Sequence, residues 1–136
     1  MGKSHMKLCR FINAALLALL ITGSPLTFAH HAFTAQYDAE ARTALTGVLV
    51  KVEWLNPHAY FYLDVEDPET GEVTTWACEL GSPVSMLRQG WTRESLVLGE
   101  IFEVEGALAR DGSSSMNASR VVIESTGVRL FSRRQD

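Results

Sequence analysis

Hydrophobic and polar residues alternate with a period of two along most of the chain after residue 43, a pattern typical of β-strands with one buried face. In residues 45–55 this alternation places four apolar side chains on one face: Val48, Val50, Val52 and Trp54. In residues 60–66 it sets apolar side chains opposite Tyr60 and Tyr62. The same period predicts further strands at residues 73–80, 100–108, 116–124 and, for a shorter stretch, 128–131.

Turn and helix signals divide these strands. Pro68 and Gly71 predict a tight turn between the second and third strands, because proline fixes φ and glycine accepts positive φ. After the third strand the period of two is lost at Ser82, which can cap a helix whose first residue is Pro83. The sequence therefore predicts a β-hairpin followed by one short helix over residues 83–89.

Three strands, a helix and then two further strands form the element order of an OB-type barrel. We therefore expect an all-β domain with one short helix: an OB-like five-stranded antiparallel barrel, with the helix between strands 3 and 4. In such a barrel the first strand, residues 45–55, pairs with both 60–66 and 100–108, and Gly47 permits the bend. An open antiparallel sheet with the helix laid across it has the same local pattern, and periodicity does not separate the two.

The N-terminal 29 residues have the layout of a secretory signal peptide. A basic start is followed by the apolar run FINAALLALLIT, by Pro25 and by small residues at Thr27 and Ala29. The run of 12 residues is shorter than the roughly 20 needed to span a bilayer. We expect cleavage after Ala29, a single domain over residues 30–136, location in the periplasm or outside the cell, and no membrane attachment after cleavage.

Charge and cysteine content narrow the partners and the compartment. Without the three basic residues of the signal segment, nine basic residues stand against 16 acidic ones, a net charge of −7. A nucleic-acid partner is therefore not expected, because a polyanion needs a basic surface. Cys78 is then the one cysteine of the mature chain, so no internal disulfide forms. Its phase on an apolar strand face predicts a buried, inert thiol.

The mature chain lacks the motifs of common enzyme classes. It has three histidines, no Gly-x-Ser-x-Gly elbow and no glycine loop before a helix, and Glu79 is expected to be solvated on a polar strand face. We therefore expect a small binding or accessory module, acting on a small ligand or a periplasmic protein, rather than an enzyme.

The histidines indicate metal binding. Cleavage after Ala29 frees the α-amino group of His30, so that amine and imidazole can chelate one ion. A third nitrogen, from His58 in preference to His31, completes a nitrogen-only site that favours Cu(II). The simpler interpretation is a loose terminus beside a turn histidine.

Two alternatives to a copper-binding module remain. Tyr60 and Tyr62 project from the outward face of the second strand, where OB barrels bind oligosaccharides or other chains, so an oligosaccharide, a peptide or a protein partner is possible there. A copper-dependent redox enzyme is the other alternative.

Several segments resemble an uncharacterised family of small exported bacterial proteins, which has a His-His start, a Trp-x-Asn-Pro-His segment and a Leu-Gly-Ser-Pro helix start. In this chain they read HHAFTAQYD from His30, LTGVLVKVEWLNPHAYFYLDV from Leu45, WACELGSP from Trp76 and LRQGWTRESLVLGE from Leu87. The departures are Ala32, where the family often has serine, and Cys78, where it often has a small apolar residue. The resemblance implies export and the extent of the domain, and it implies no activity.

Overall fold

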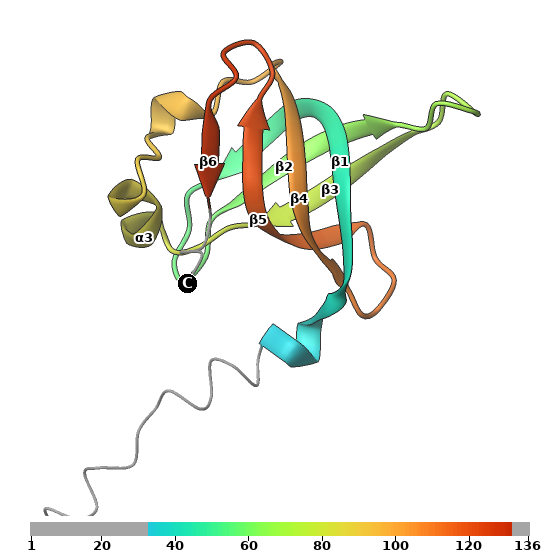
Figure 1. Cartoon of the computed structure of the whole chain (residues 1–136), viewed down its shortest axis with the longest axis horizontal. Helices are drawn as coiled ribbons and strands as arrows, with labels where there is room; N and C mark the ends of the chain where they lie inside the picture. Colours follow the sequence, from blue (N-terminus) through green and yellow to red (C-terminus); the bar gives the residue numbers. More distant parts are fainter. Residues whose placement is uncertain (1–32, 132–136) are drawn as a thin grey trace, which may run out of the picture. The chain divides into compact units, whose positions relative to one another are not determined.

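Six β-strands and three short helical segments make up residues 33–131, the part of the chain that the computed structural model describes (Figure 1). A helical turn over residues 33–36 precedes the first strand. The remaining elements are β1 (Tyr37–Glu53), β2 (Tyr60–Glu66), β3 (Val73–Glu79), α3 (Pro83–Arg88), the 3-10 turn η1 (Arg93–Ser95), β4 (Ile101–Ala109), β5 (Ser115–Ile123) and β6 (Arg129–Phe131).

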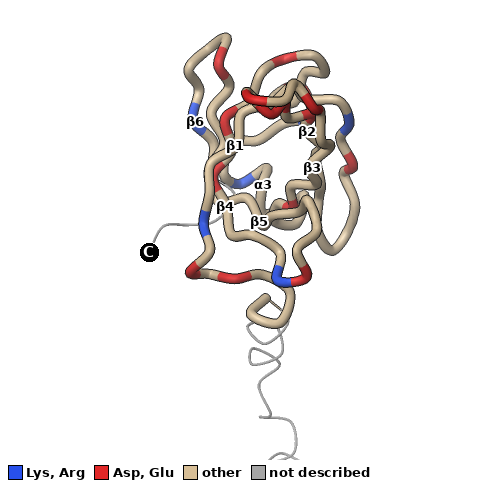
Figure 2. The backbone as a smooth tube through the Cα atoms, turned by 90° about the vertical axis from the view of Figure 1, so that its right-hand side faces the viewer, with Lys and Arg blue, Asp and Glu red and all other residues tan. Residues whose placement is uncertain are grey.

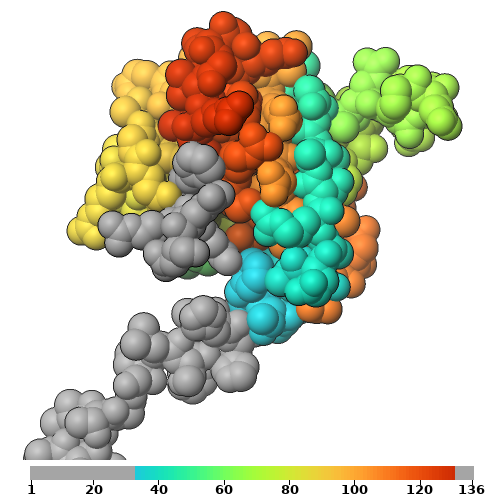
Figure 3. Space-filling view, in the orientation of Figure 1, coloured from blue at the N-terminus to red at the C-terminus, as the bar shows by residue number. Residues whose placement is uncertain are grey.

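Five of the strands form a closed ring. The sheet order is β3-β2-β1-β4-β5-β6, and an additional pairing between β3 and β5 joins the two sides. Figure 2 shows β1 to β5 arranged around the interior of the domain. β6 lies outside the ring, where it pairs antiparallel with β5. The β2–β3 hairpin projects beyond the ring (Figure 3).

The long first strand holds the ring together. β1 pairs with β2 through its second half and with β4 through most of its length, so the predicted double pairing is confirmed. Gly47 is required at the crossing, because a Cβ there would lie 2.6 Å from the backbone oxygen of Asp64. β1 begins at Tyr37, well before the predicted start at Leu45.

A β-bulge between Leu49 and Lys51 corrects the predicted faces of β1. Leu49 is buried, whereas Val48 and Val50, which were predicted to share a face with Val52, are each 39% exposed. The bulge adds one residue to the strand and so reverses the alternation after it. Beyond the bulge, Val52 packs against the core as predicted.

Two further expectations are wrong in detail. Contrary to the prediction, the strands of the ring are not all antiparallel to their neighbours. β3 and β5 run parallel through three residue pairs, from Ala77–Ser115 to Glu79–Asn117. The helical content is also not a single helix: besides α3 there are the turn at residues 33–36 and η1. α3 itself starts at Pro83, with the Ser82 hydroxyl accepting the backbone N–H of Ser85, and ends one residue earlier than predicted.

The core fills the ring and extends under α3. Phe61 and Phe102 meet edge to face inside the ring, with their ring centroids 6.0 Å apart. Met86 of α3 and Trp91, which follows Gly90, are fully buried against the same core. None of the described helices is long and apolar enough to cross a membrane.

Candidate functional site

Glu79, the last residue of β3, is buried although the alternation of the strand predicts a solvated side chain. It is 4% exposed. A carboxylate loses hydration on burial, and hydrogen bonds must replace that loss. The prediction of a solvated Glu79 is therefore wrong, and its partners define the candidate site.

Four donors surround the Glu79 carboxylate. The Tyr37 hydroxyl lies 2.6 Å from Oε2 and the Tyr60 hydroxyl 3.1 Å from the same oxygen. Asn117 Nδ2 lies 3.3 Å from Oε1, and His58 Nδ1 lies 2.7 Å from Oε1. Among the described residues no buried side-chain nitrogen or oxygen lacks a hydrogen-bond partner.

The strands position these side chains at the point where the ring closes. Glu79 is the register partner of Tyr60 in the antiparallel β2–β3 pair and of Asn117 in the parallel β3–β5 pair. Tyr37 enters from the first residue of β1. Residues from β1, β2 and β5 therefore converge on one carboxylate at the end of β3.

Backbone hydrogen bonds hold the His58 loop beside Glu79. Ala59 N–H donates to the Gly81 carbonyl over 3.1 Å, and Leu80 N–H donates to the Ala59 carbonyl over 2.8 Å. These two bonds tie the residue after His58 to the residues after Glu79. Pro57, joined to Asn56 by a cis peptide bond, precedes His58 in the same loop.

The geometry assigns different roles to the two nitrogens of His58. An ionised carboxylate only accepts hydrogen bonds, so Nδ1 carries the proton that points at Glu79. The side chain is 49% exposed, and nothing within residues 33–131 bonds to Nε2. His58 thus presents Nε2, with its lone pair when the ring is neutral, at the surface.

The two tyrosines on Glu79 remain protonated over a wide pH range. Burial raises the pKa of Tyr37 far above its ordinary value, and the hydrogen bond to Glu79 raises it further. Burial and the charge of Glu79 raise the pKa of Tyr60 to about 12. Both hydroxyls therefore act as donors at neutral pH.

Tyr62 belongs to a separate group on the outward face of β1 and β2. Its hydroxyl donates to Glu53 over 2.8 Å, and Lys51 lies 4.7 Å from its ring centroid. Lys51 and Glu53 also form a 2.7 Å ion pair. Lys51 and Tyr62 both lower the pKa of the Glu53 carboxyl, with Lys51 the larger cause. The tyrosine pair predicted as one ligand surface is therefore divided between two carboxylates.

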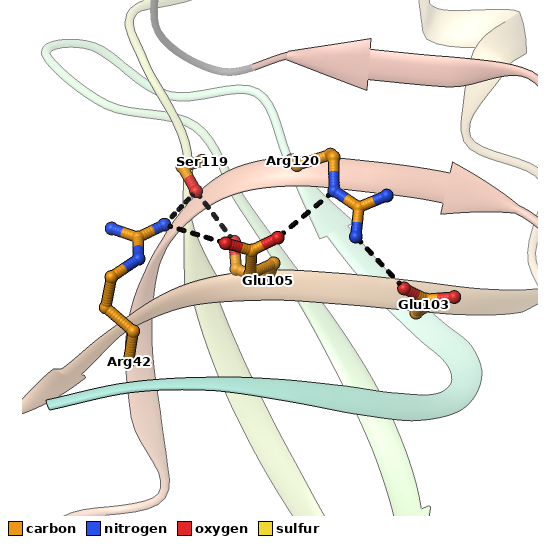
Figure 4. A network of polar contacts seen from close by, with 5 residues as sticks. All are labelled: Arg42, Glu103, Glu105, Ser119 and Arg120. Atoms are coloured by element: carbon orange, nitrogen blue, oxygen red, sulfur yellow. Dashed lines mark hydrogen bonds and ion pairs between the residues drawn. The ribbon is translucent and has the colours of Figure 1, made fainter.

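A second polar network covers the outer face of β1, β4 and β5 (Figure 4). Glu105 accepts from Arg42 over 3.4 Å and from Arg120 over 3.2 Å. Arg120 also reaches Glu103 over 3.2 Å, and Arg42 donates to Ser119 over 2.6 Å. The four side chains that form ion pairs in this network are between 28% and 48% exposed.

The structure brings only part of the predicted site together. His58 and Tyr60 both contact Glu79. His30 and His31 lie outside the described residues, as does the predicted signal peptide. Within the described range there is no group of three or more His, Cys, Asp or Glu side chains that could hold a metal ion.

Sequence reasoning missed Glu79, Tyr37 and Asn117. One available signal was the hairpin register, since the turn containing Pro68 and Gly71 places Tyr60 opposite Glu79. By contrast, Cys78 is fully buried as predicted, and burial raises the pKa of its thiol to about 12.

These observations define a small domain of mostly antiparallel strands, closed into a ring of five, with a polar cluster at the closure. A family model described as a family of unknown function, DUF6152, matches residues 18–118, and the chain belongs to this family. Neither curated proteins nor solved structures give a match. The prediction that the chain belongs to an uncharacterised family is therefore confirmed.

Proposed function

We propose that the chain is an exported binding module whose ligand is Cu(II), held in part by His58. The observation that carries this proposal is the 2.7 Å contact between His58 Nδ1 and the buried Glu79. Metal-ligating histidines commonly donate their other ring N–H to a carboxylate, which orients the ring and increases the basicity of the ligating nitrogen. His58 has this arrangement, and its Nε2 is the nitrogen left for a metal.

The other ligands come from the sequence-based prediction. In a chain that starts at His30, the α-amino group and the imidazole of His30 supply two nitrogens, and His58 supplies the third. His31 is the less suitable third ligand, because its neighbour already chelates. Nitrogen-only ligation favours Cu(II) among the common divalent ions. This proposal includes removal of residues 1–29 on export to the periplasm or beyond.

The closed ring supports the finer description of the fold as an OB-like barrel. The element order agrees with that fold, and β1 pairs with strands on both sides. Bulges next to Leu49 and next to Gly106 provide the curvature that closure requires.

The contacts of the tyrosines favour the metal over an oligosaccharide, a peptide or a protein partner. The hydroxyls of both tyrosines that were predicted to face outward already donate to carboxylates, and Lys51 covers one face of Tyr62. A copper-dependent redox enzyme would use the same histidines and differs by turning over a substrate.

Copper titration of protein that begins at His30 tests the proposal. We expect one Cu(II) per chain, with nitrogen ligation visible by electron paramagnetic resonance. His58→Ala should weaken binding, and one extra residue before His30 should weaken it as well, because the free amine is lost. His31→Ala is the matched control and should bind as the unaltered protein does. Equal, weak binding by all four proteins would contradict the proposal.

Export is tested separately. Intact-mass measurement of protein recovered after secretion should give a chain that starts at His30. A mass that includes residues 6–29 would contradict both the exported location and the amine ligand.

A further inference from the structure

The Glu79 carboxylate has a donor for each of the roughly four lone-pair directions of a carboxylate. Oε2 accepts from two tyrosine hydroxyls, and Oε1 accepts from Asn117 and His58. Three of these donors are neutral side chains on strands, and they hold the carboxylate whether or not His58 binds anything. The orientation of Oε1 toward His58 is therefore set by the strands.

Tyr37 makes the shortest of the tyrosine contacts and is itself firmly held. Its hydroxyl lies 2.6 Å from Oε2, against 3.1 Å for Tyr60, and the residue is 2% exposed. The Tyr37 ring packs against Phe33, with 5.8 Å between centroids. Its backbone carbonyl accepts Arg110 Nε over 3.2 Å, so both ends of the residue are fixed.

We infer that Tyr37 is a positioning residue for the His58 site and acts through Glu79. By holding Oε2, Tyr37 turns Oε1 toward His58, and Oε1 then selects the tautomer that carries its proton on Nδ1. This choice leaves Nε2 as the nitrogen that binds a ligand. The metal-binding part of the inference rests on the proposed function, whereas the tautomer part concerns the metal-free protein alone.

Two measurements on the same variants test the inference. Nitrogen-15 NMR of the metal-free protein, at a pH where the spectrum shows the neutral ring, gives the tautomer of His58. Copper titration of protein beginning at His30 gives the affinity. The variants are Tyr37→Phe, Glu79→Gln and the matched control Tyr62→Phe, which removes a hydroxyl from the same sheet that contacts Glu53 instead of Glu79.

We expect the unaltered protein and Tyr62→Phe to show the Nδ1–H tautomer, and Tyr37→Phe to show a mixture. Copper affinity should fall about 10- to 100-fold in Glu79→Gln, as for other residues that orient a ligand, and by about tenfold or less in Tyr37→Phe. An unchanged tautomer in folded Tyr37→Phe would overturn the inference. If Tyr37→Phe does not fold, an unchanged tautomer in Glu79→Leu, whose side chain cannot accept a hydrogen bond, overturns it instead.

The two proposals fail in different ways. If the tautomer shifts in Tyr37→Phe while no protein, the unaltered one included, binds copper, the positioning role stands and the proposed function fails. If copper binds and the tautomer is insensitive to Tyr37→Phe, the positioning role fails and the proposed function stands.

Discussion

Two of the polar networks within residues 33–131, those centred on Glu105 and Glu79, differ in exposure. Glu105 lies on the outer face of the sheet between Arg42 and Arg120, and its side chain is 38% exposed (Figure 4). Glu79 lies at the ring closure, and its side chain is 6% exposed. The partners of Glu105 include two guanidinium groups, whereas Glu79 has hydroxyls, an amide and an imidazole.

This difference in exposure indicates which of the two networks contributes more to the stability of the fold. Exposed ion pairs contribute little, because water solvates both charges and salt screens them. A buried carboxylate with four donors is different, since removing either the carboxylate or a donor leaves buried polar groups without a hydrogen-bond partner and without water. We therefore expect substitutions in the Glu79 cluster to lower the free energy of unfolding far more than substitutions in the Glu105 network.

The largest effect is expected from Glu79→Ala. This change leaves the Tyr37 hydroxyl and the Asn117 amide buried without their acceptor, and it should lower the free energy of unfolding by about 3 kcal/mol or more. Urea denaturation measures the loss.

Glu53→Ala is the matched control for Glu79→Ala. Glu53 also accepts a tyrosine hydroxyl, but Glu53 and its partners Lys51 and Tyr62 lie on the outward face. The control should lower the free energy of unfolding far less than Glu79→Ala does, because water already solvates this group. Equal losses in the two variants would contradict the comparison between buried and exposed networks.

An intermediate effect is expected at alkaline pH. Burial holds the pKa of Tyr37 in the folded protein above its ordinary value of 10.0, so the contribution of Tyr37 to stability is complete below pH 10.0 and is lost as pH rises through the folded pKa. The free energy of unfolding should fall above about pH 10, by at most about 1.4 kcal/mol per pH unit for one tyrosine.

Stability measured against pH in Tyr37→Phe isolates this contribution. The slope above about pH 10 should be shallower in the variant than in the unaltered protein. Identical slopes would show that Tyr37 is not the group whose titration matters.

The smallest effect is expected from Arg120→Ala. Removing its contacts with Glu103 and Glu105 should lower the free energy of unfolding by about 1 kcal/mol or less. The loss should shrink further in about 1 M salt, where charges are screened within about 3 Å. A loss as large as that of Glu79→Ala, unaffected by salt, would reverse the ranking of the two networks.

The strands with regular alternation were predictable from the sequence. β2 has the predicted bounds, because its apolar residues alternate without interruption between a proline turn and the turn containing Pro68 and Gly71. The start of β1 was missed although the charged residues from Asp38 to Arg42 occupy every second position. The residues between them are alanines, which favour strands weakly and bury little apolar surface. That part is a strand because it pairs with β4, and pairing between distant segments leaves no local signal.

The candidate site was only half predictable. His58 and Tyr60 attract attention as residue types, and both contact Glu79. Alternation places Glu79 on a polar face, and only the closure of the ring, which brings Asn117 beside it, makes that face an interior. Tyr37 was missed for the same reason, since its burial depends on a partner 42 residues away.

The long-range pairings that close the ring also bear on how quickly the domain is expected to fold. Glu79 and Asn117 are 38 residues apart in sequence, and the neighbouring β1–β4 contact between Arg42 and Glu105 spans 63 residues. The chain must bring such distant segments together before their contacts repay the lost entropy of the loops between them. Proteins dominated by contacts of this kind fold in milliseconds to seconds, and until β5 arrives the edge of β3 is open to pairing with another chain. We therefore expect slow closure of the ring to favour aggregation, because the three residue pairs between β3 and β5 cover an edge that is otherwise open.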